Sequence, residues 1–168
     1  MIWTSDKARQ FQFGRLPRAV APMALGLVAL VLRFQGLSRQ SLWADEGNSY
    51  GMAVRALSEI APAAGADIHP PLYYYLLNLW ARLFGTSEAG LRSLSAVVGC
   101  LLVITTYLWA RRLAGAAAGV VAGALAAISP FALYYSQEAR AYILMALLVS
   151  LSTWALTEYL LGSRSRRW

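Results

Sequence analysis

Charged residues are scarce in this 168-residue chain: they make up only 14% of it, whereas 58% of the residues are hydrophobic. A soluble globular domain usually carries about 25% charged and about 45–50% apolar residues. Because a domain of this size buries only about two-thirds of its chain surface, it cannot hide so many apolar side chains from water. The composition therefore excludes a soluble fold and predicts a membrane protein built as one module over residues 1–168.

Cysteine and histidine each occur once, as Cys100 and His69. A lone cysteine inside an apolar run forms neither an intramolecular disulfide nor a cysteine metal cluster, so we interpret Cys100 as a small hydrophobe. A glycine-rich phosphate loop, a Ser–His–Asp order and an HExxH element are also missing, which leaves soluble nucleotide chemistry without support. The sequence defines no cofactor: a divalent metal is compatible with it, but no ligand cluster supports one.

Four long apolar runs are present, at about 16–37, 92–110, 113–133 and 141–161. Each is close to the roughly 20 residues that a helix needs to cross the hydrocarbon core of a bilayer. The first run follows basic residues and is not followed by a small-residue cleavage site, so we interpret it as an uncleaved signal anchor. The sequence predicts an all-α, polytopic membrane protein with about four transmembrane helices.

The outer loop of this arrangement, at about 38–91, contains two further predicted helices. The first covers Gly47–Ile60. The second, Pro71–Phe84, is about 21 Å long and too short to span, and it mixes aromatic with polar residues. Such a composition favours the headgroup boundary, which predicts a juxtamembrane amphipathic helix lying on the membrane.

The distribution of basic residues orients the predicted spans. With the amino terminus in the cytoplasm, nine of the 15 basic residues flank the spans on the inner side: Lys7, Arg9, Arg15, Arg18, Arg111, Arg112, Arg164, Arg166 and Arg167. This agrees with the positive-inside rule and predicts a multi-pass protein of the cell membrane. Because the basic charge forms short membrane flanks rather than one patch, nucleic acid is not an expected partner.

The adjacent carboxylates Asp45 and Glu46 are the candidate catalytic residues of the outer loop. Asp45 has two interpretations: a helix cap that accepts the free N–H groups of the next helix, or a general base or metal ligand at the membrane surface. His69, in the segment Asp67-Ile-His-Pro-Pro, is either a turn residue or a ligand for phosphate or metal.

Arg92 and Arg140 each lie where an outer loop meets an apolar run. Arginines at such positions snorkel, pair with acids or bind phosphate through the planar guanidinium fork. Glu138, two residues from Arg140, is a possible partner in an ion pair. Together with His69, Glu138 and Tyr142 these arginines form the predicted substrate-binding set, which suits a substrate with a lipid tail and a phosphate head.

Several motifs occur in an order that resembles a known family: Trp43-Ala-Asp-Glu, His69-Pro-Pro-Leu-Tyr-Tyr, Phe84-Gly-Thr-Ser-Glu, Leu91-Arg-Ser-Leu-Ser-Ala and Tyr135-Ser-Gln-Glu-Ala-Arg-Ala-Tyr. They resemble membrane glycosyltransferases with the GT-C fold, in the group of dolichyl-phosphate-mannose protein mannosyltransferases and aminoarabinose transferases. The resemblance covers roughly residues 38–160. Such enzymes usually have about eleven or more spans, so the chain corresponds to their amino-terminal part.

The resemblance implies a polyprenyl-phosphate-linked sugar donor and a lipid or protein acceptor on the outer face of the membrane. It implies that Asp45 deprotonates the acceptor, that Glu46 assists or orients it, and that Arg92 and Arg140 bind the donor phosphate. Membrane lipids, and a second membrane subunit that completes the site, are the other expected partners. A non-catalytic scaffold or a subunit of a split enzyme is the alternative. A lipid carrier is disfavoured because the charged residues lie near the ends of the spans, not at mid-bilayer depth.

Overall fold

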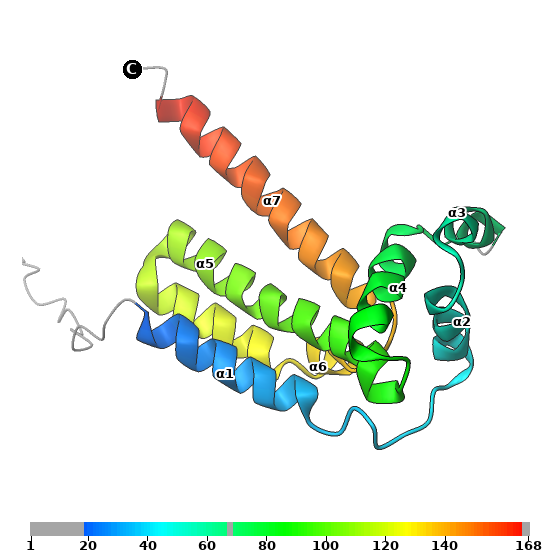
Figure 1. Ribbon diagram of the computed structural model, residues 1–168. Coiled ribbons are helices and arrows are strands. Elements are labelled where there is room, and N and C mark those ends of the chain that lie inside the picture. Colours follow the sequence, from blue (N-terminus) through cyan, green and yellow to red (C-terminus); the bar gives the residue numbers. More distant parts are fainter. Residues whose placement is uncertain (1–18, 67–68, 166–168) are drawn as a thin grey trace, which may run out of the picture.

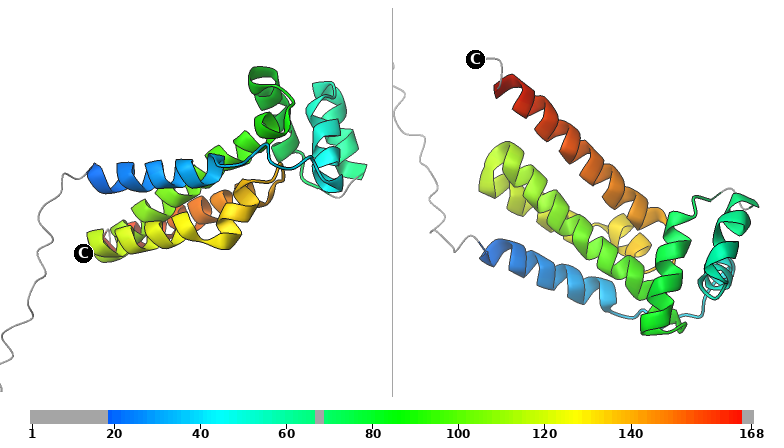
Figure 2. Two further views of the ribbon diagram at one scale, coloured as in Figure 1. Left: turned by 90° about the horizontal axis from the view of Figure 1, so that it is seen from below. Right: turned by 45° about the horizontal axis from the view of Figure 1, so that its top comes forward.

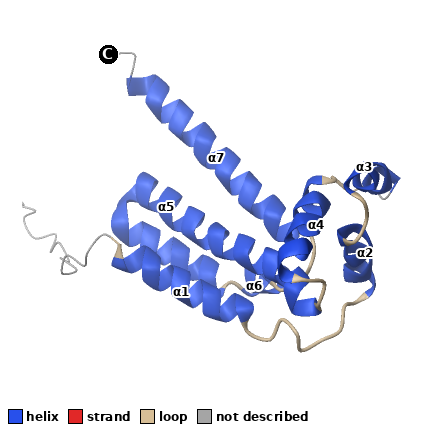
Figure 3. Ribbon diagram, in the orientation of Figure 1, coloured by secondary structure: helices blue, strands red, loops and turns tan. Residues whose placement is uncertain are grey.

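The computed structural model describes residues 19–66 and 69–165, and within them all regular elements are helices (Figure 3). The predicted all-α class is confirmed. Several residues of the sequence argument lie outside the described residues: Lys7, Arg9, Arg15, Arg18, Asp67, Arg166, Arg167 and the side chain of Arg164. The predicted basic flank before the first apolar run is therefore among the parts of which the structure says nothing.

Three apolar helices, α1 (Val20–Phe34), α5 (Glu88–Ile128) and α7 (Tyr142–Ser165), form the elongated part of the molecule (Figure 1). By length and composition α5 and α7 can cross a membrane, and α1 is a shorter apolar helix. Large side chains of α7, such as Met145, Val149 and Leu156, are exposed, as expected of a helix surrounded by lipid. The helices support a membrane protein, while the number of spans stays a prediction.

Helix α5 is a hairpin of two antiparallel arms that reverses at Gly115, whose φ of 87° lies in the left-handed region (Figures 1 and 2). Two further glycines let the arms approach. A Cβ at Gly119 would lie 2.7 Å from Cβ of Arg111, and a Cβ at Gly123 would lie 3.1 Å from Cβ of Tyr107. The reversal places the predicted run 92–110 and most of the run 113–133 on this one element.

Helices α2 (Ala44–Ala53), α3 (Leu57–Ala66) and α4 (Leu72–Phe84) form a group at one end of the molecule (Figure 1). The main hydrophobic core lies between this group and the first turns of α5 and α7. In α4, which begins directly after Pro71 as predicted, Tyr73, Leu77 and Ala81 are buried, whereas Leu79 and Leu83 are exposed. One face of α4 thus packs into the core, and a leucine-rich face remains uncovered, as in a helix at a membrane surface.

The predicted single helix over Gly47–Ile60 is wrong, because the chain forms α2 and α3 with a break between them. The amide nitrogen Nδ2 of Asn78 donates to the carbonyl oxygens of Ala53 at 2.8 Å and Arg55 at 2.9 Å. These bonds satisfy carbonyls that would otherwise bond within a longer helix, so a side chain of α4 ends α2.

The third apolar run, expected at about 113–133, does not form one continuous helix to its end. Helix α5 stops at Ile128, and a separate helix, α6 (Pro130–Ser136), begins after Ser129. The Ser129 hydroxyl oxygen accepts the backbone N–H of Ala132 at 3.4 Å, and Pro130 occupies the first helical position, where its missing N–H has no cost. The apolar run expected at about 113–133 is therefore divided between the second arm of α5 and the beginning of α6.

Two polar side chains join the ends of α1 and α5. Arg33, fully buried in the last turn of α1, donates to the carbonyls of Ala126 at 3.1 Å and Ala127 at 3.2 Å. In the opposite direction, Nε2 of Gln137 donates to the carbonyls of Leu32 and Gln35, each at 3.1 Å. Carbonyls at the ends of both helices thus gain partners, and the loop that follows α1 is anchored beside α6.

Candidate active site

The acidic pair lies in the first turn of α2, and its two side chains have different surroundings. Glu46 is fully buried, and its carboxylate accepts hydrogen bonds from Arg92 Nε at 2.8 Å and Nη2 at 2.5 Å. It also accepts the backbone N–H of Ala139 at 2.8 Å and that of Trp43 at 3.4 Å. Glu46 therefore links α2 to α5 and to the segment between α6 and α7.

Burial and hydrogen bonding have opposite effects on Glu46. Removal from water disfavours the charged carboxylate, but the bonds from Arg92 and from the Ala139 N–H outweigh it and hold the pKa of Glu46 below its usual value. Both carboxylate oxygens are occupied by protein donors. A charged, fully hydrogen-bonded Glu46 carboxylate can orient its neighbours. It is poorly suited to act as a base, because a base must accept a proton from the substrate.

Arg92 uses all of its guanidinium N–H groups within the protein. Besides its bonds to Glu46, it donates to the carbonyl oxygens of Leu37 and Gln40, each at 2.8 Å, and of Ser41 at 3.2 Å. A guanidinium group has five donors, and these contacts account for all five. Arg92 thus fixes the loop between α1 and α2, and a phosphate would have to displace existing bonds to reach it.

Asp45 points to a more open environment: 48% of its side chain is exposed. Its Oδ2 lies 3.5 Å from Nη2 of Arg140, whose Nη1 donates to the Asp45 carbonyl oxygen at 3.2 Å. Arg140 also donates to the Tyr142 hydroxyl at 3.4 Å and lies 5.5 Å from the centre of that ring. Arg140 therefore pairs with Asp45, not with Glu138 as one interpretation of the sequence proposed.

The capping interpretation of Asp45 is wrong for this helix. Helix α2 begins at Ala44, and Trp43 occupies the N-cap position, so Asp45 is already within the first turn. Its charge still lies at the positive end of the helix dipole.

His69 contacts Tyr74 of α4: the two rings meet edge to face with centres 6.5 Å apart. The neighbouring Tyr73 is buried, and its hydroxyl and the Ser95 hydroxyl are 3.1 Å apart. Ser95 donates to the Arg140 carbonyl at 3.4 Å, and burial raises the pKa of Tyr73 above its usual value. The structure thus places a set of rings and hydroxyls beneath Arg140.

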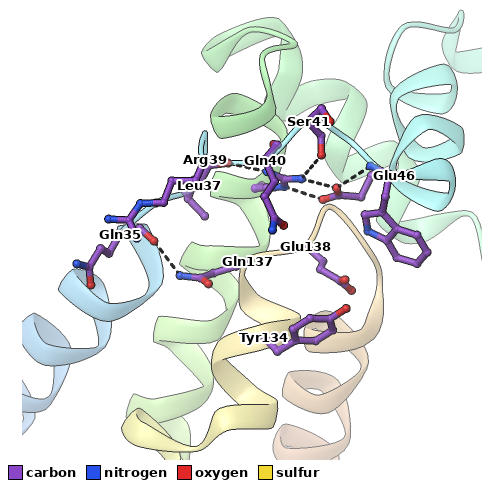
Figure 4. Close-up of a pocket in the computed structure, with 12 residues that line it drawn as sticks. Gln35, Leu37, Arg39, Gln40, Ser41, Glu46, Tyr134, Gln137 and Glu138 are labelled. Atoms are coloured by element: carbon purple, nitrogen blue, oxygen red, sulfur yellow. Dashed lines mark hydrogen bonds and ion pairs between the residues drawn. The ribbon is translucent and has the colours of Figure 1, made fainter.

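A cavity of about 450 Å³ opens on the other side of the Glu46–Arg92 pair (Figure 4). One wall is the loop between α1 and α2, from Gln35 to Trp43, and the opposite wall carries Tyr134, Gln137 and Glu138. The volume is within the range of about 300–1,000 Å³ that is typical of small-molecule sites. Amide, carboxylate and aromatic side chains in one cavity are the groups that bind hydroxyl-rich ligands.

The structure therefore brings together most of the predicted site residues in two adjoining parts. Asp45, Arg140 and Tyr142 form an outer cluster, which we call the Asp45 cluster, and Arg92, Glu46 and Glu138 contribute to the cavity. His69 is placed by its contact with Tyr74 of α4. Sequence reasoning missed the loop residues of the cavity, above all Arg39. The available signal was the unusual density of polar residues in Gln35-Gly-Leu-Ser-Arg-Gln-Ser directly after an apolar run.

Among residues 19–66 and 69–165, no three His, Cys, Asp or Glu side chains are grouped so that they could hold a metal ion. Asp67, the acidic neighbour of His69 in sequence, lies outside this part of the chain.

Comparisons with known proteins point to one family. A family model described as dolichyl-phosphate-mannose-protein mannosyltransferase matches residues 68–168. An uncharacterized protein of Aquifex aeolicus is 29% identical over 93 residues, which cover 51% of this chain and 19% of the relative. A polyprenol-phosphate-mannose–protein mannosyltransferase of Corynebacterium glutamicum is 28% identical over 148 residues, which cover 79% of this chain and 28% of the relative. The chain thus spans less than a third of the length of either relative, and no solved structure matches it.

Proposed function

Because this chain belongs to the dolichyl-phosphate-mannose-protein mannosyltransferase family, we propose that it takes part in transferring a sugar from a polyprenyl-phosphate donor to an acceptor at the outer face of the cell membrane. The match to the Corynebacterium protein mannosyltransferase supports mannose as the sugar and a protein as the acceptor. Because the chain spans only part of such relatives, we propose this activity for the chain in its full native context, in which a second membrane subunit is one expected partner.

One observation carries the proposal: the two neighbouring acids of α2 are held in different states. Glu46 is buried and fully hydrogen-bonded, whereas the Asp45 carboxylate is half exposed beside Arg140. Adjacent carboxylates in unlike environments can take different roles, one positioning and the other exchanging protons. We assign the role of general base to Asp45. Glu46 and Arg92 hold the helix turn that carries Asp45 in its orientation.

In this mechanism Asp45 accepts the proton of the acceptor hydroxyl as the hydroxyl oxygen attacks the anomeric carbon of the donor sugar. The bond between that carbon and the phosphate oxygen breaks, and its electron pair leaves with polyprenyl phosphate. Attack from the face opposite the leaving group inverts the anomeric configuration. The acceptor approaches from the side of Tyr142 and His69, and the donor sugar occupies the cavity, where Glu138 accepts hydrogen bonds from its hydroxyls.

The direct test is a transfer assay on membranes of cells that produce the chain, in its full native context, with radiolabelled polyprenyl-phosphate mannose as donor. We expect labelled protein to accumulate together with an equal amount of released polyprenyl phosphate. Membranes that lack the chain are the control. If these membranes transfer and release as much as those with the chain, the proposal is refuted.

The proposed topology has a separate test. After Cys100→Ser, single cysteines replace Ser58 on α3 and Ala116 at the α5 reversal, both of which are exposed. In the proposed orientation an impermeant thiol reagent labels position 58 in intact cells and reaches position 116 only after the membrane is opened. Labelling of position 116 in intact cells would refute four spans with a cytoplasmic amino terminus.

A further inference from the structure

The arginines around the candidate site differ in how far their N–H groups are used. All five donors of Arg92 are bonded to protein oxygens, and Arg140 is engaged by Asp45 and Tyr142. Arg39, on the cavity wall, is exposed, and its guanidinium makes no hydrogen bond or ion pair with any residue that the structure describes. Among these three arginines, the unused guanidinium donors therefore belong to Arg39.

The position of Arg39 is defined by Gly36. The backbone N–H of Arg39 donates to the Gly36 carbonyl at 3.0 Å, which closes a tight turn. Gly36 has a φ of 80°, and a Cβ there would lie 2.9 Å from Cδ and 3.0 Å from Nε of Arg39. The aliphatic part of the Arg39 side chain thus packs against Gly36, where a Cβ would leave no room for it. The turn places the Arg39 guanidinium at the edge of the cavity (Figure 4).

The two walls of the cavity have complementary chemistry. Arg39 supplies a positive charge with free donors, which favours a phosphate. Across the cavity, Glu138 supplies a carboxylate, which repels phosphate and accepts hydrogen bonds from hydroxyls. Trp43, at the far end of the Arg39 wall in sequence, adds a half-exposed ring. The negative charge of Glu46 is already neutralised by Arg92. A ligand that satisfies both walls is anionic at one end and rich in hydroxyls at the other.

The anionic end of such a ligand lies near the membrane. Arg39 follows the end of the apolar helix α1, at Phe34, by only five residues. A phosphate that is attached to a lipid tail is held at the headgroup level, which is where an apolar helix ends.

Resting on the proposed function, we propose that Arg39 binds the phosphate of the polyprenyl-phosphate sugar and that the sugar extends from there toward Glu138. Arg92, which the sequence suggested for the phosphate, acts instead as a positioning residue that holds the loop carrying Arg39. This assignment orients the donor in the cavity, with the lipid at the α1 end and the sugar near α2.

The test is the binding of polyprenyl phosphate and of uncharged polyprenol to the full protein in phosphatidylcholine nanodiscs. We expect Arg39→Gln to weaken binding of polyprenyl phosphate about tenfold or more, because charge-assisted bonds are lost, and to leave polyprenol binding unchanged. Arg39→Lys should retain part of the affinity. Arg82→Gln, which removes another exposed arginine from outside this cavity, is the matched control and should bind like the wild type.

Two results would overturn the assignment: unchanged affinity of Arg39→Gln for polyprenyl phosphate, or an equal loss of phosphate and polyprenol binding. Competition by phosphatidylglycerol at equal concentration would also overturn it, since the site would then recognise any anionic lipid. If the transfer assay fails but Arg39→Gln still weakens the binding of polyprenyl phosphate, only the proposed function is refuted. If the Arg39→Gln variant transfers sugar and binds the donor with unchanged affinity, only the assignment of Arg39 is refuted.

Discussion

Replacing Asp45 with asparagine should leave the protein folded and inserted but lower sugar transfer about 100-fold or more. Asparagine keeps the size of the side chain and can still accept hydrogen bonds, so the contact with Arg140 is weakened but its space stays filled. It cannot take up the acceptor proton. The measurement is the initial rate of transfer from polyprenyl-phosphate mannose at equal amounts of membrane-inserted protein.

Glu59→Gln is the matched control for this prediction, because Glu59 is an exposed acid in the first turn of α3 and lies outside the site. It removes one negative charge from the same part of the molecule and should transfer at the wild-type rate. Wild-type transfer by Asp45→Asn would rule out the base role. A loss of transfer in both variants would mean that the charge of the α2–α4 group matters, not the identity of the base.

The second large effect concerns stability. Removing the partner of a buried, hydrogen-bonded carboxylate costs about 3–5 kcal/mol, because the remaining charge stays buried without compensation. Arg92→Ala should therefore lower the free energy of unfolding by about this amount, since Glu46 is fully buried and three carbonyls of the α1–α2 loop also lose their donor. Unfolding by increasing sodium dodecyl sulfate in mixed micelles gives the measurement.

The protein contains its own control for this experiment. Arg112 and Glu158 form an ion pair of 2.8 Å whose side chains are 56% and 39% exposed. An exposed pair contributes about 0–1 kcal/mol, so Arg112→Ala should change the unfolding curve little. Arg92→Lys, which keeps the charge but not the five-donor fork, should lie between the two. Equal stability of Arg92→Ala and Arg112→Ala would contradict the structural role of Arg92.

The local parts of the fold were predictable from the sequence. Helix α4 begins after the two prolines, and α7 begins within one residue of the predicted fourth apolar run, because proline geometry and apolar periodicity act within a few residues. The break between α2 and α3 was not predictable. It depends on Asn78, which reaches Ala53 from a helix 25 positions away in sequence.

The same distinction applies to the candidate site. Residue types and motif order located the acids and arginines, but their pairing depends on tertiary structure. Glu46 meets Arg92 across 46 residues, and Asp45 meets Arg140 across 95. Sequence alone gave no reason to prefer Asp45–Arg140 over Glu138–Arg140. It also gave no means to see that all five guanidinium donors of Arg92 are bonded within the protein, whereas the Arg39 guanidinium bonds to none of the residues that the structure describes.

The bond of Arg33 to the end of α5 has a consequence for biosynthesis. Its acceptor at Ala127 is 94 residues further along the chain, so at a synthesis rate of about 5–20 residues per second it emerges roughly 5–20 s later. During that interval a guanidinium in the last turn of the first apolar helix has no permanent partner. It must stay hydrated at the membrane surface, because an unpaired charge in hydrocarbon is costly. In the four-span arrangement α1 therefore reaches its final depth only when the second arm of α5 arrives. A chain interrupted before residue 126 would leave the Arg33 guanidinium without either of its acceptors, the carbonyl oxygens of Ala126 and Ala127.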